Sequence, residues 1–167
     1  MYRLLVLSLA LLPVAALQAQ PQTHPPSTAA ERAKAVEFAA SLESDPLGDQ
    51  ARERRQWLLR WLIEVPDIHV KVCSGFFGPL LGSKKNYAAE LFTQSTASAA
   101  AFVISNPDKA GDDLAQYAAG LQGTLRAYES ILKVKPKARW PYLDGLIEKR
   151  DKGELAEYVR QTAGHCK

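Results

Sequence analysis

The stretch LAQYAAGLQGTLRAYESIL, residues 114–132, decides the fold class. Its apolar side chains recur in alternating steps of four and three residues, which lays them along one stripe of an α-helix; they are Leu114, Ala118, Leu121, Leu125, Tyr128 and Leu132. Gly120 and Gly123 each cost such a helix about 1 kcal/mol relative to alanine. The pattern predicts a long amphipathic helix, in which the glycines are unfavourable unless they permit tight packing.

Further helical patterns lie on both sides of this stretch. Thr28 and Glu31 have the spacing of a capping box at the start of the first helix, and Asp49 can cap the second. A proline follows each of the first three predicted helices within two residues. The five additional helices are predicted over residues 29–44, 49–65, 86–105, 141–153 and 154–163. About six helices with short connections predict an all-α protein, a single irregular helical bundle or array.

Residues 67–82 interrupt the helical patterns. Ile68, Val70 and Val72 alternate as in a β-strand, but no other segment offers a strand with which they could pair. We predict irregular structure or a short helix here.

The N-terminus has the organisation of a secretory signal peptide. One positive charge, Arg3, precedes an uncharged apolar run over residues 4–17, and we place the cleavage after Ala19, although Val14 and Ala16 form an equally acceptable pair. The run is shorter than the roughly 20 residues that span a bilayer, and no basic flank follows it. We therefore predict a signal peptide over residues 1–19, a flexible proline-rich leader over 20–28 and a helical domain over 29–167.

The charge balance bears on the partners of the exported chain. The net charge is +3, and cleavage would remove only Arg3 among the charged residues, which leaves +2. This near-balance argues against nucleic acid as a partner. An acidic partner could still meet either of two basic stretches, at Arg52, Arg54 and Arg55 or over residues 133–139, although a solvated helix face explains such stretches equally simply.

Cys73 and Cys166 are the only cysteines, and export would place them where disulfides persist. We predict that they pair. The alternative is a zinc site that adds His69 and His165 to the two cysteines, but His165 and Cys166 are adjacent, whereas structural zinc ligands are normally spaced by two to four residues. We therefore predict no metal and no cofactor.

Residues 73–82 are rich in both turn-forming and apolar residues. The segment contains three glycines and a proline together with Phe76, Phe77, Leu80 and Leu81. One interpretation is a loop tucked into the core. The functional interpretation is an exposed apolar loop that binds a partner or enters a membrane surface, with Lys84 and Lys85 suited to anionic headgroups.

A short stretch over residues 128–136 resembles the end of the second helix of a tetratricopeptide repeat, which typically closes on a proline. The tryptophan, leucine and glycine pattern of the first helix of such a repeat is absent upstream. The peptide-binding role of that family is therefore not inferred.

The sequence carries no motif that fixes a reaction. It contains no G-x-S-x-G, H-E-x-x-H, P-loop or G-x-G-x-x-G pattern, so no catalytic residue is predicted. Glu64, Asp67 and His69 could supply acid and base groups, but spacing alone does not position them. We expect a periplasmic or extracellular helical protein with a non-catalytic interaction or structural role, whose partner is an unknown protein or a membrane surface. The alternative is an exported hydrolase without a recognisable motif.

Overall fold

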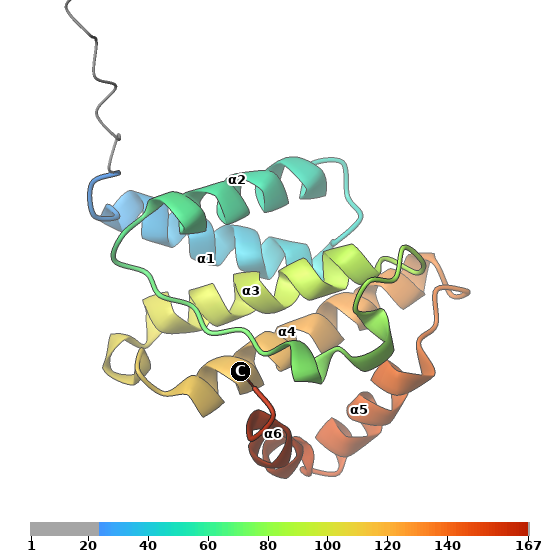
Figure 1. The fold of residues 1–167 in the computed structure, drawn as a ribbon. Coiled ribbons are helices and arrows are strands. Elements are labelled where there is room, and N and C mark those ends of the chain that lie inside the picture. Colours follow the sequence, from blue (N-terminus) through green and yellow to red (C-terminus); the bar gives the residue numbers. More distant parts are fainter. Residues whose placement is uncertain (1–23, 167) are drawn as a thin grey trace, which may run out of the picture.

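The computed structural model describes residues 24–166, which contain six α-helices and three short 3-10 turns (Figure 1). The helices are α1 (Ala29–Ser44), α2 (Ala51–Glu64), α3 (Ala88–Ser105), α4 (Asp113–Val134), α5 (Pro141–Asp151) and α6 (Leu155–Ala163). The 3-10 turns are η1 (Ser74–Phe76), η2 (Gly78–Leu80) and η3 (Pro107–Lys109). The described chain has no strand, which confirms the predicted all-α bundle of about six helices. The predicted signal peptide lies outside the described residues.

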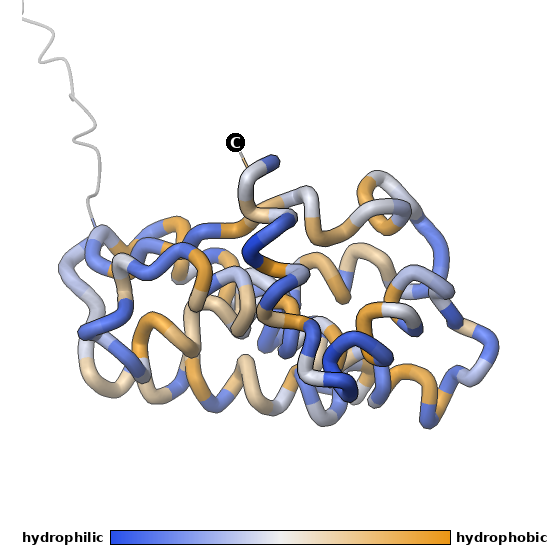
Figure 2. Tube along the Cα trace, turned by 90° about the horizontal axis from the view of Figure 1, so that it is seen from below, coloured by the Kyte–Doolittle hydropathy of each residue, from blue (hydrophilic) through white to orange (hydrophobic). Residues whose placement is uncertain are grey.

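The helices form three layers (Figure 1). The antiparallel pair α3 and α4 lies in the middle and makes the most extensive helix–helix contact. The α1–α2 hairpin covers one side of this pair through α1, while α5 and α6 cover the other. Hydrophobic and hydrophilic residues alternate along the helices, as amphipathic packing requires (Figure 2).

The glycines of α4 allow the central helices to approach closely. A Cβ atom added at Gly120 would lie 2.9 Å from the carbonyl oxygen of Ser95, and one at Gly123 would collide with the side chain of Ser98. Small residues on α3 face them, so both helices keep short side chains at the contact. The two glycines thus permit the tight packing that compensates for their low helix propensity.

The larger core lies between the α3–α4 pair and the C-terminal helices. Its buried members include large side chains from η1, η2 and all four of these helices: Phe76, Phe77, Leu80, Leu91, Leu121, Leu125, Tyr128, Ile131, Leu143, Leu146, Leu155 and Val159. A smaller core forms where α1, α2 and the segment after α2 meet α3, from Ala35, Trp61, Val65, Ile68 and Val103. Burial of these faces supplies the main driving force for the arrangement.

Two predicted helix starts are wrong. The N-cap of α2 is Gln50, one residue after Asp49, and no side chain caps this helix. The predicted helix over 86–105 begins at Ala88, because Asn86 and Tyr87 adopt left-handed backbone with φ angles of 49° and 59°. The capping box of α1 is confirmed: Glu31 N–H donates to Thr28 Oγ1 at 3.2 Å, and Thr28 N–H donates to Glu31 Oε2 at 2.7 Å.

The segment between α2 and η1 is extended but pairs with no strand in the described chain. A buried glutamine replaces the missing strand: Lys71 N–H donates to Gln116 Oε1 at 2.7 Å, and Gln116 Nε2 donates to the Ala110 carbonyl at 2.7 Å. The segment is therefore irregular, as predicted, and its alternating apolar residues reach the core without a sheet.

The folded part begins before the predicted end of the leader. Ser27 is buried, and both its N–H and its hydroxyl donate to the carboxylate of Asp67 at 2.7 Å. Arg32 donates to the same carboxylate at 2.8 Å. These bonds join the residues just before α1 to the extended segment, so Ser27 belongs to the domain.

None of the helices within residues 24–166 is long and apolar enough to cross a membrane.

Candidate functional site

Cys73 and Cys166 lie at disulfide distance, with their Cα atoms 5.2 Å apart. Cys73 is buried at the start of η1, and Cys166 follows α6. The pair joins the turn-rich segment to the C-terminal helix, as predicted. It also engages both sulfur atoms that the alternative zinc site would need. Within residues 24–166, no group of three or more potential ligands is arranged to hold a metal ion.

Of the two interpretations of residues 73–82, the structure agrees with the loop tucked into the core. Phe76, Phe77 and Leu80 are 2%, 1% and 3% exposed, so the interpretation of an interaction loop is wrong for these three residues. Phe77 packs edge-on against Phe92, with ring centroids 4.8 Å apart. Leu81 alone of the four remains accessible, at 47%.

A hydroxyl group fixes the turn around the buried phenylalanines. Tyr142 of α5 donates to the carbonyl of Phe76 at 3.0 Å and shares a hydrogen bond of 2.7 Å with the hydroxyl of Tyr158 of α6. Burial and the neighbouring Tyr158 hydroxyl raise the pKa of Tyr142, so its hydroxyl keeps its proton. The segment is therefore a buried structural connection between α3, α5 and α6.

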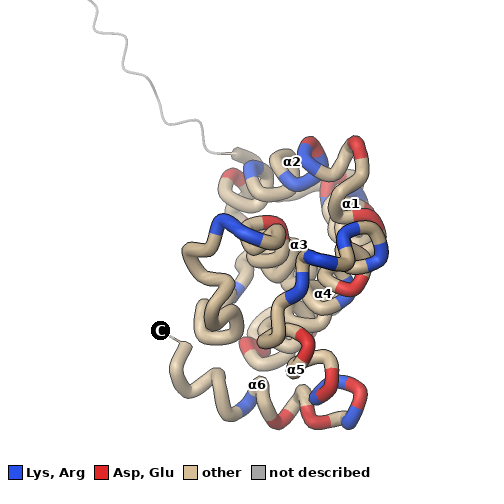
Figure 3. Tube along the Cα trace, turned by 90° about the vertical axis from the view of Figure 1, so that its right-hand side faces the viewer, with Lys and Arg blue, Asp and Glu red and all other residues tan. Residues whose placement is uncertain are grey.

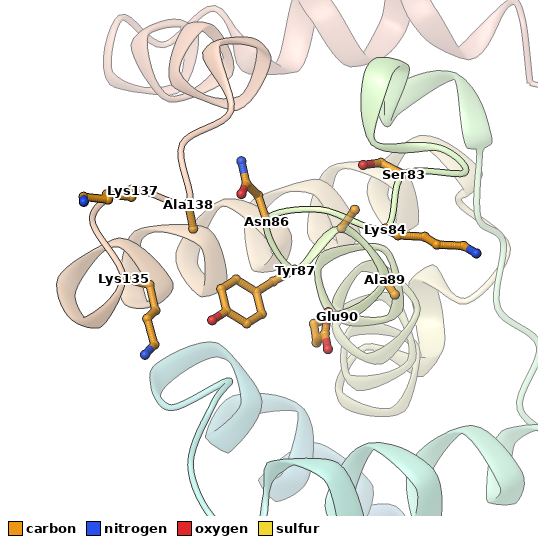
Figure 4. Close-up of a pocket in the computed structure, with 10 residues that line it drawn as sticks. Ser83, Lys84, Asn86, Tyr87, Ala89, Glu90, Lys135, Lys137 and Ala138 are labelled. Atoms are coloured by element: carbon orange, nitrogen blue, oxygen red, sulfur yellow. The ribbon is translucent and has the colours of Figure 1, made fainter.

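A large cavity lies at the end of the bundle where α3 begins and α4 ends. Its volume is about 680 Å³. Two segments that are about 50 residues apart in sequence form its walls (Figure 4); the residues are Ser83, Lys84, Asn86, Tyr87, Ala88, Ala89, Glu90, Lys135, Lys137 and Ala138.

Hydrogen bonds between the two segments hold the cavity together. Trp140 Nε1 donates to the carbonyl of Asn86 at 3.0 Å, and Asn86 Nδ2 donates to the carbonyl of Arg139 at 3.0 Å. Both bonds use the left-handed conformation of Asn86, which turns its backbone and side chain towards the connector that follows α4. The unusual backbone at the start of α3 is therefore fixed by tertiary contacts.

The connector is fixed in turn by a buried tyrosine. Tyr128 of α4 accepts a hydrogen bond from Trp140 N–H at 2.8 Å and donates to Asp144 Oδ1 at 2.8 Å. Burial, more than the nearby Asp144, raises the pKa of Tyr128, which therefore stays protonated and able to donate.

Six basic side chains gather at this end, and we refer to them as the basic end: Lys84, Lys85, Lys133, Lys135, Lys137 and Arg139. Figure 3 looks onto this side of the molecule and shows Lys and Arg segments close to α3 and α4. Within residues 24–166, Arg139 is the one member in a salt bridge, with Asp144 at 3.3 Å. All six side chains are exposed, so their positive charge is available to a partner.

The cavity does not concentrate these charges on one point. Lys84 and Lys137 lie on opposite sides with their amino groups directed away from each other, and the ring of Tyr87 lies between them (Figure 4). Glu90 also lines the cavity, but the half-buried Arg55 of α2 lies close enough to interact with its charge. Burial lowers the pKa of Arg55 and Glu90 opposes that shift. The geometry suits an extended anionic surface better than one small anion.

The cavity has no nucleophile that is held by a base. Ser83 is its one hydroxyl besides Tyr87, and Ser83 Oγ accepts from Lys85 N–H at 3.2 Å. No hydrogen bond joins Ser83 to a carboxylate or histidine in the described part of the chain. Glu64 ends α2 and Asp67 and His69 follow that helix, outside the cavity lining, and Asp67 is engaged by Ser27 and Arg32. These groups thus show no arrangement for acid–base catalysis.

The second basic stretch, on α2, has a structural role. Arg54 donates to Ser41 and Gln50 and lies over the ring of Phe38, while Arg55 donates to the carbonyl of Pro46 at 2.9 Å. These contacts join α2 to α1 and to the connection between them.

The convergence of Lys84 and Lys85 with residues 133–139 was not predicted from the sequence, in which the two lysines stand beside the apolar loop and residues 133–139 form a separate basic stretch. The sequence did contain a signal for this convergence. The two basic segments flank two long helices, which the short connection between them must fold antiparallel. The start of the first helix then lies beside the end of the second. Comparison of the chain with protein-family models, with curated proteins and with solved structures finds no match.

Proposed function

We propose that the chain is an exported, disulfide-stabilised helical protein that acts without catalysis and binds an anionic partner through the basic end. The observation that carries this proposal is the convergence of two basic segments around this cavity, where five lysines have no salt-bridge partner among the described residues. Such unneutralised charges create a field that attracts an acidic partner. The buried phenylalanines leave this charged end as the more favourable contact surface.

Export is supported by the signal-peptide pattern of residues 1–19 together with the cysteine pair. Disulfides persist mainly outside the reducing cytosol, and both cysteines of this chain lie at disulfide distance. Fractionation of the native host with an antibody against the protein tests this part. Recovery in the exported fraction with an N-terminus at Gln20 is expected, whereas a cytosolic chain that keeps Met1 would contradict it.

A charge-matched pair of variants tests the binding role. Lys84→Gln/Lys135→Gln/Lys137→Gln removes three charges from the basic end, and Lys109→Gln/Lys149→Gln/Lys152→Gln removes three exposed lysines elsewhere. We expect the wild type and the second variant to bind at least one of three polyanions, namely polyglutamate, dextran sulfate and anionic vesicles. The first variant should bind much more weakly. Equal binding by both variants, or no binding by the wild type, would contradict the proposal.

A further inference from the structure

We infer that the anionic partner is a lipid membrane surface with acidic headgroups, which the protein touches with two loop regions, residues 81–85 and residues 133–137, where α4 ends and its connector begins. This inference rests on the proposed function and names the class of partner. The loops lie at the same end of the bundle, since both contribute walls to the cavity described above.

Each loop combines an exposed aliphatic side chain with lysines. Leu81 is 47% exposed and is followed by Lys84 and Lys85. Val134 is 63% exposed and lies between Lys133 and Lys135. Leu81 and Val134 do not line the cavity but are close in sequence to residues that do: Leu81 follows η2, two residues before Ser83, and Val134 ends α4 directly before Lys135. Two separate segments thus present the same combination of apolar and cationic groups to the solvent.

This combination fits the interface of an anionic bilayer. Aliphatic side chains at loop tips gain free energy when they enter the boundary between headgroups and acyl chains, and lysines beside them can place their amino groups among acidic headgroups. The amino groups of Lys84 and Lys137 lie on opposite sides of the cavity (Figure 4). That spacing matches several headgroups at once, because a bilayer presents many charges over an area.

Phe76 and Phe77 are not the apolar groups of this contact. The sequence allowed them to enter a membrane surface as one of two interpretations, but both side chains are buried against α3 and α6. Leu81 and Val134 take their place as the exposed apolar groups. The expected contact is shallow, since only these loops take part.

Vesicle co-sedimentation of the exported protein tests the inference. The probes are vesicles of phosphatidylcholine alone and of equal parts phosphatidylcholine and phosphatidylglycerol. We expect binding to the anionic vesicles at about 0.1 M NaCl and its loss at about 1 M, where charges are screened within about 3 Å. The triple variant Lys84→Gln/Lys135→Gln/Lys137→Gln should bind about a hundredfold more weakly, on the basis of roughly fivefold for each lysine.

A second pair of variants tests the apolar contacts. Leu81→Ser/Val134→Ser should weaken binding to anionic vesicles severalfold and leave the salt dependence in place. Ile63→Ser is the matched control, because Ile63 is 85% exposed at the opposite end of the molecule, near the end of α2. The control should bind as the wild type does. Circular dichroism should show an unchanged thermal midpoint for both, since all three residues are exposed.

Three results would overturn the inference: no binding of the wild type to anionic vesicles, binding unaffected by Leu81→Ser/Val134→Ser, or equal binding by the lysine variant and its charge-matched control. If polyglutamate or dextran sulfate is bound through the same lysines while vesicles are not, the membrane inference fails and the proposed anion-binding function stands. If none of the polyanions is bound, both fail.

Discussion

Gly123 of α4 faces α3 at a point with no room for a larger side chain. A methyl group there would meet Ser98, whose hydroxyl donates to Glu43 of α1 at 2.7 Å, and Glu43 in turn pairs with Arg126 of α4. Gln94 donates to the same serine at 3.0 Å. One glycine therefore makes room for a polar network that joins three helices, in which Gln94 and Ser98 are buried while Arg126 lies at the exposed edge.

Gly123→Ala should destabilise the fold although alanine is the better helix former. The methyl group displaces Ser98 and Glu43, and such overpacking costs about 1 to 3 kcal/mol. Gly145→Ala in α5 is the control, because a methyl group there meets no atom within 4 Å. It should raise the free energy of unfolding by up to about 1 kcal/mol. Urea denaturation measures both, and equal shifts of the two midpoints would contradict the close approach.

Tyr128→Phe should also lower the free energy of unfolding, because it removes hydrogen bonds without removing the packed ring. The variant keeps the ring but leaves Trp140 N–H without its acceptor and Asp144 without its donor. A buried donor that loses its partner costs about 1 to 3 kcal/mol. Tyr117→Phe is a suitable control, since the hydroxyl of Tyr117 makes no hydrogen bond within the described residues. Urea midpoints that agree between the two variants would show that the Tyr128 hydroxyl is dispensable.

At the scale of the elements, the existence of the helices was predictable, but the starts of α2 and α3 were not. The stripe on α4 and the capping box of α1 are local patterns, so residues 114–132 and the pair Thr28 and Glu31 were sufficient. The start of α3 depends on Trp140 and Arg139, which lie more than 50 residues away. Whether Phe76 and Phe77 are buried likewise depends on which helices cover them, because a glycine-rich apolar loop can be either buried or exposed.

The junction between the residues before α1 and the extended segment should depend on pH. The backbone and side-chain hydrogen bonds from Ser27, together with Arg32, hold the pKa of Asp67 below its ordinary value of 3.8. The folded state therefore takes up a proton less readily than the unfolded state. Asp67 contributes stability above its ordinary pKa, and this contribution is lost as the pH falls through the lower folded pKa.

Asp67→Asn should accordingly unfold at a lower urea concentration than the wild type at neutral pH. The difference should shrink below about pH 4 and close as the wild-type carboxyl becomes protonated. Asp108→Asn on η3 is the control, since Asp108 is exposed and makes no side-chain hydrogen bond in residues 24–166. A difference between Asp67→Asn and the wild type that is constant with pH would contradict this role of the carboxylate.

At the scale of the whole molecule, the cysteine pair and the basic end both arise from long-range topology. The pairing was predictable because only two cysteines exist. The basic end was not assembled from the sequence, because it required the antiparallel order of α3 and α4 and the connector held by Tyr128. Local composition showed each lysine, but the fold decides which lysines act together.

Cys73→Ala/Cys166→Ala should lower the free energy of unfolding by roughly 2 to 5 kcal/mol, because the pair closes a loop with a sequence separation of 93. Dithiothreitol should reduce the stability of the wild type by a similar amount and leave the double variant unchanged. Equal urea midpoints of the wild type with and without the reductant would show that the cysteines do not pair in the purified protein.

The cysteine pair divides the chain into a covalent ring, which holds α3 to α6, and an open arm, which holds α1 and α2. Limited proteolysis would give different products from the two parts. A single tryptic cut in the ring, for example after Lys85 or Lys137, leaves both fragments joined until a reductant is added. A cut in the arm releases its N-terminal piece at once. Gels run with and without reductant would therefore show whether each cleavage site lies in the ring or in the arm. The lysine-rich loops that are proposed to touch lipid should become protected from trypsin only when the protein is bound to a vesicle.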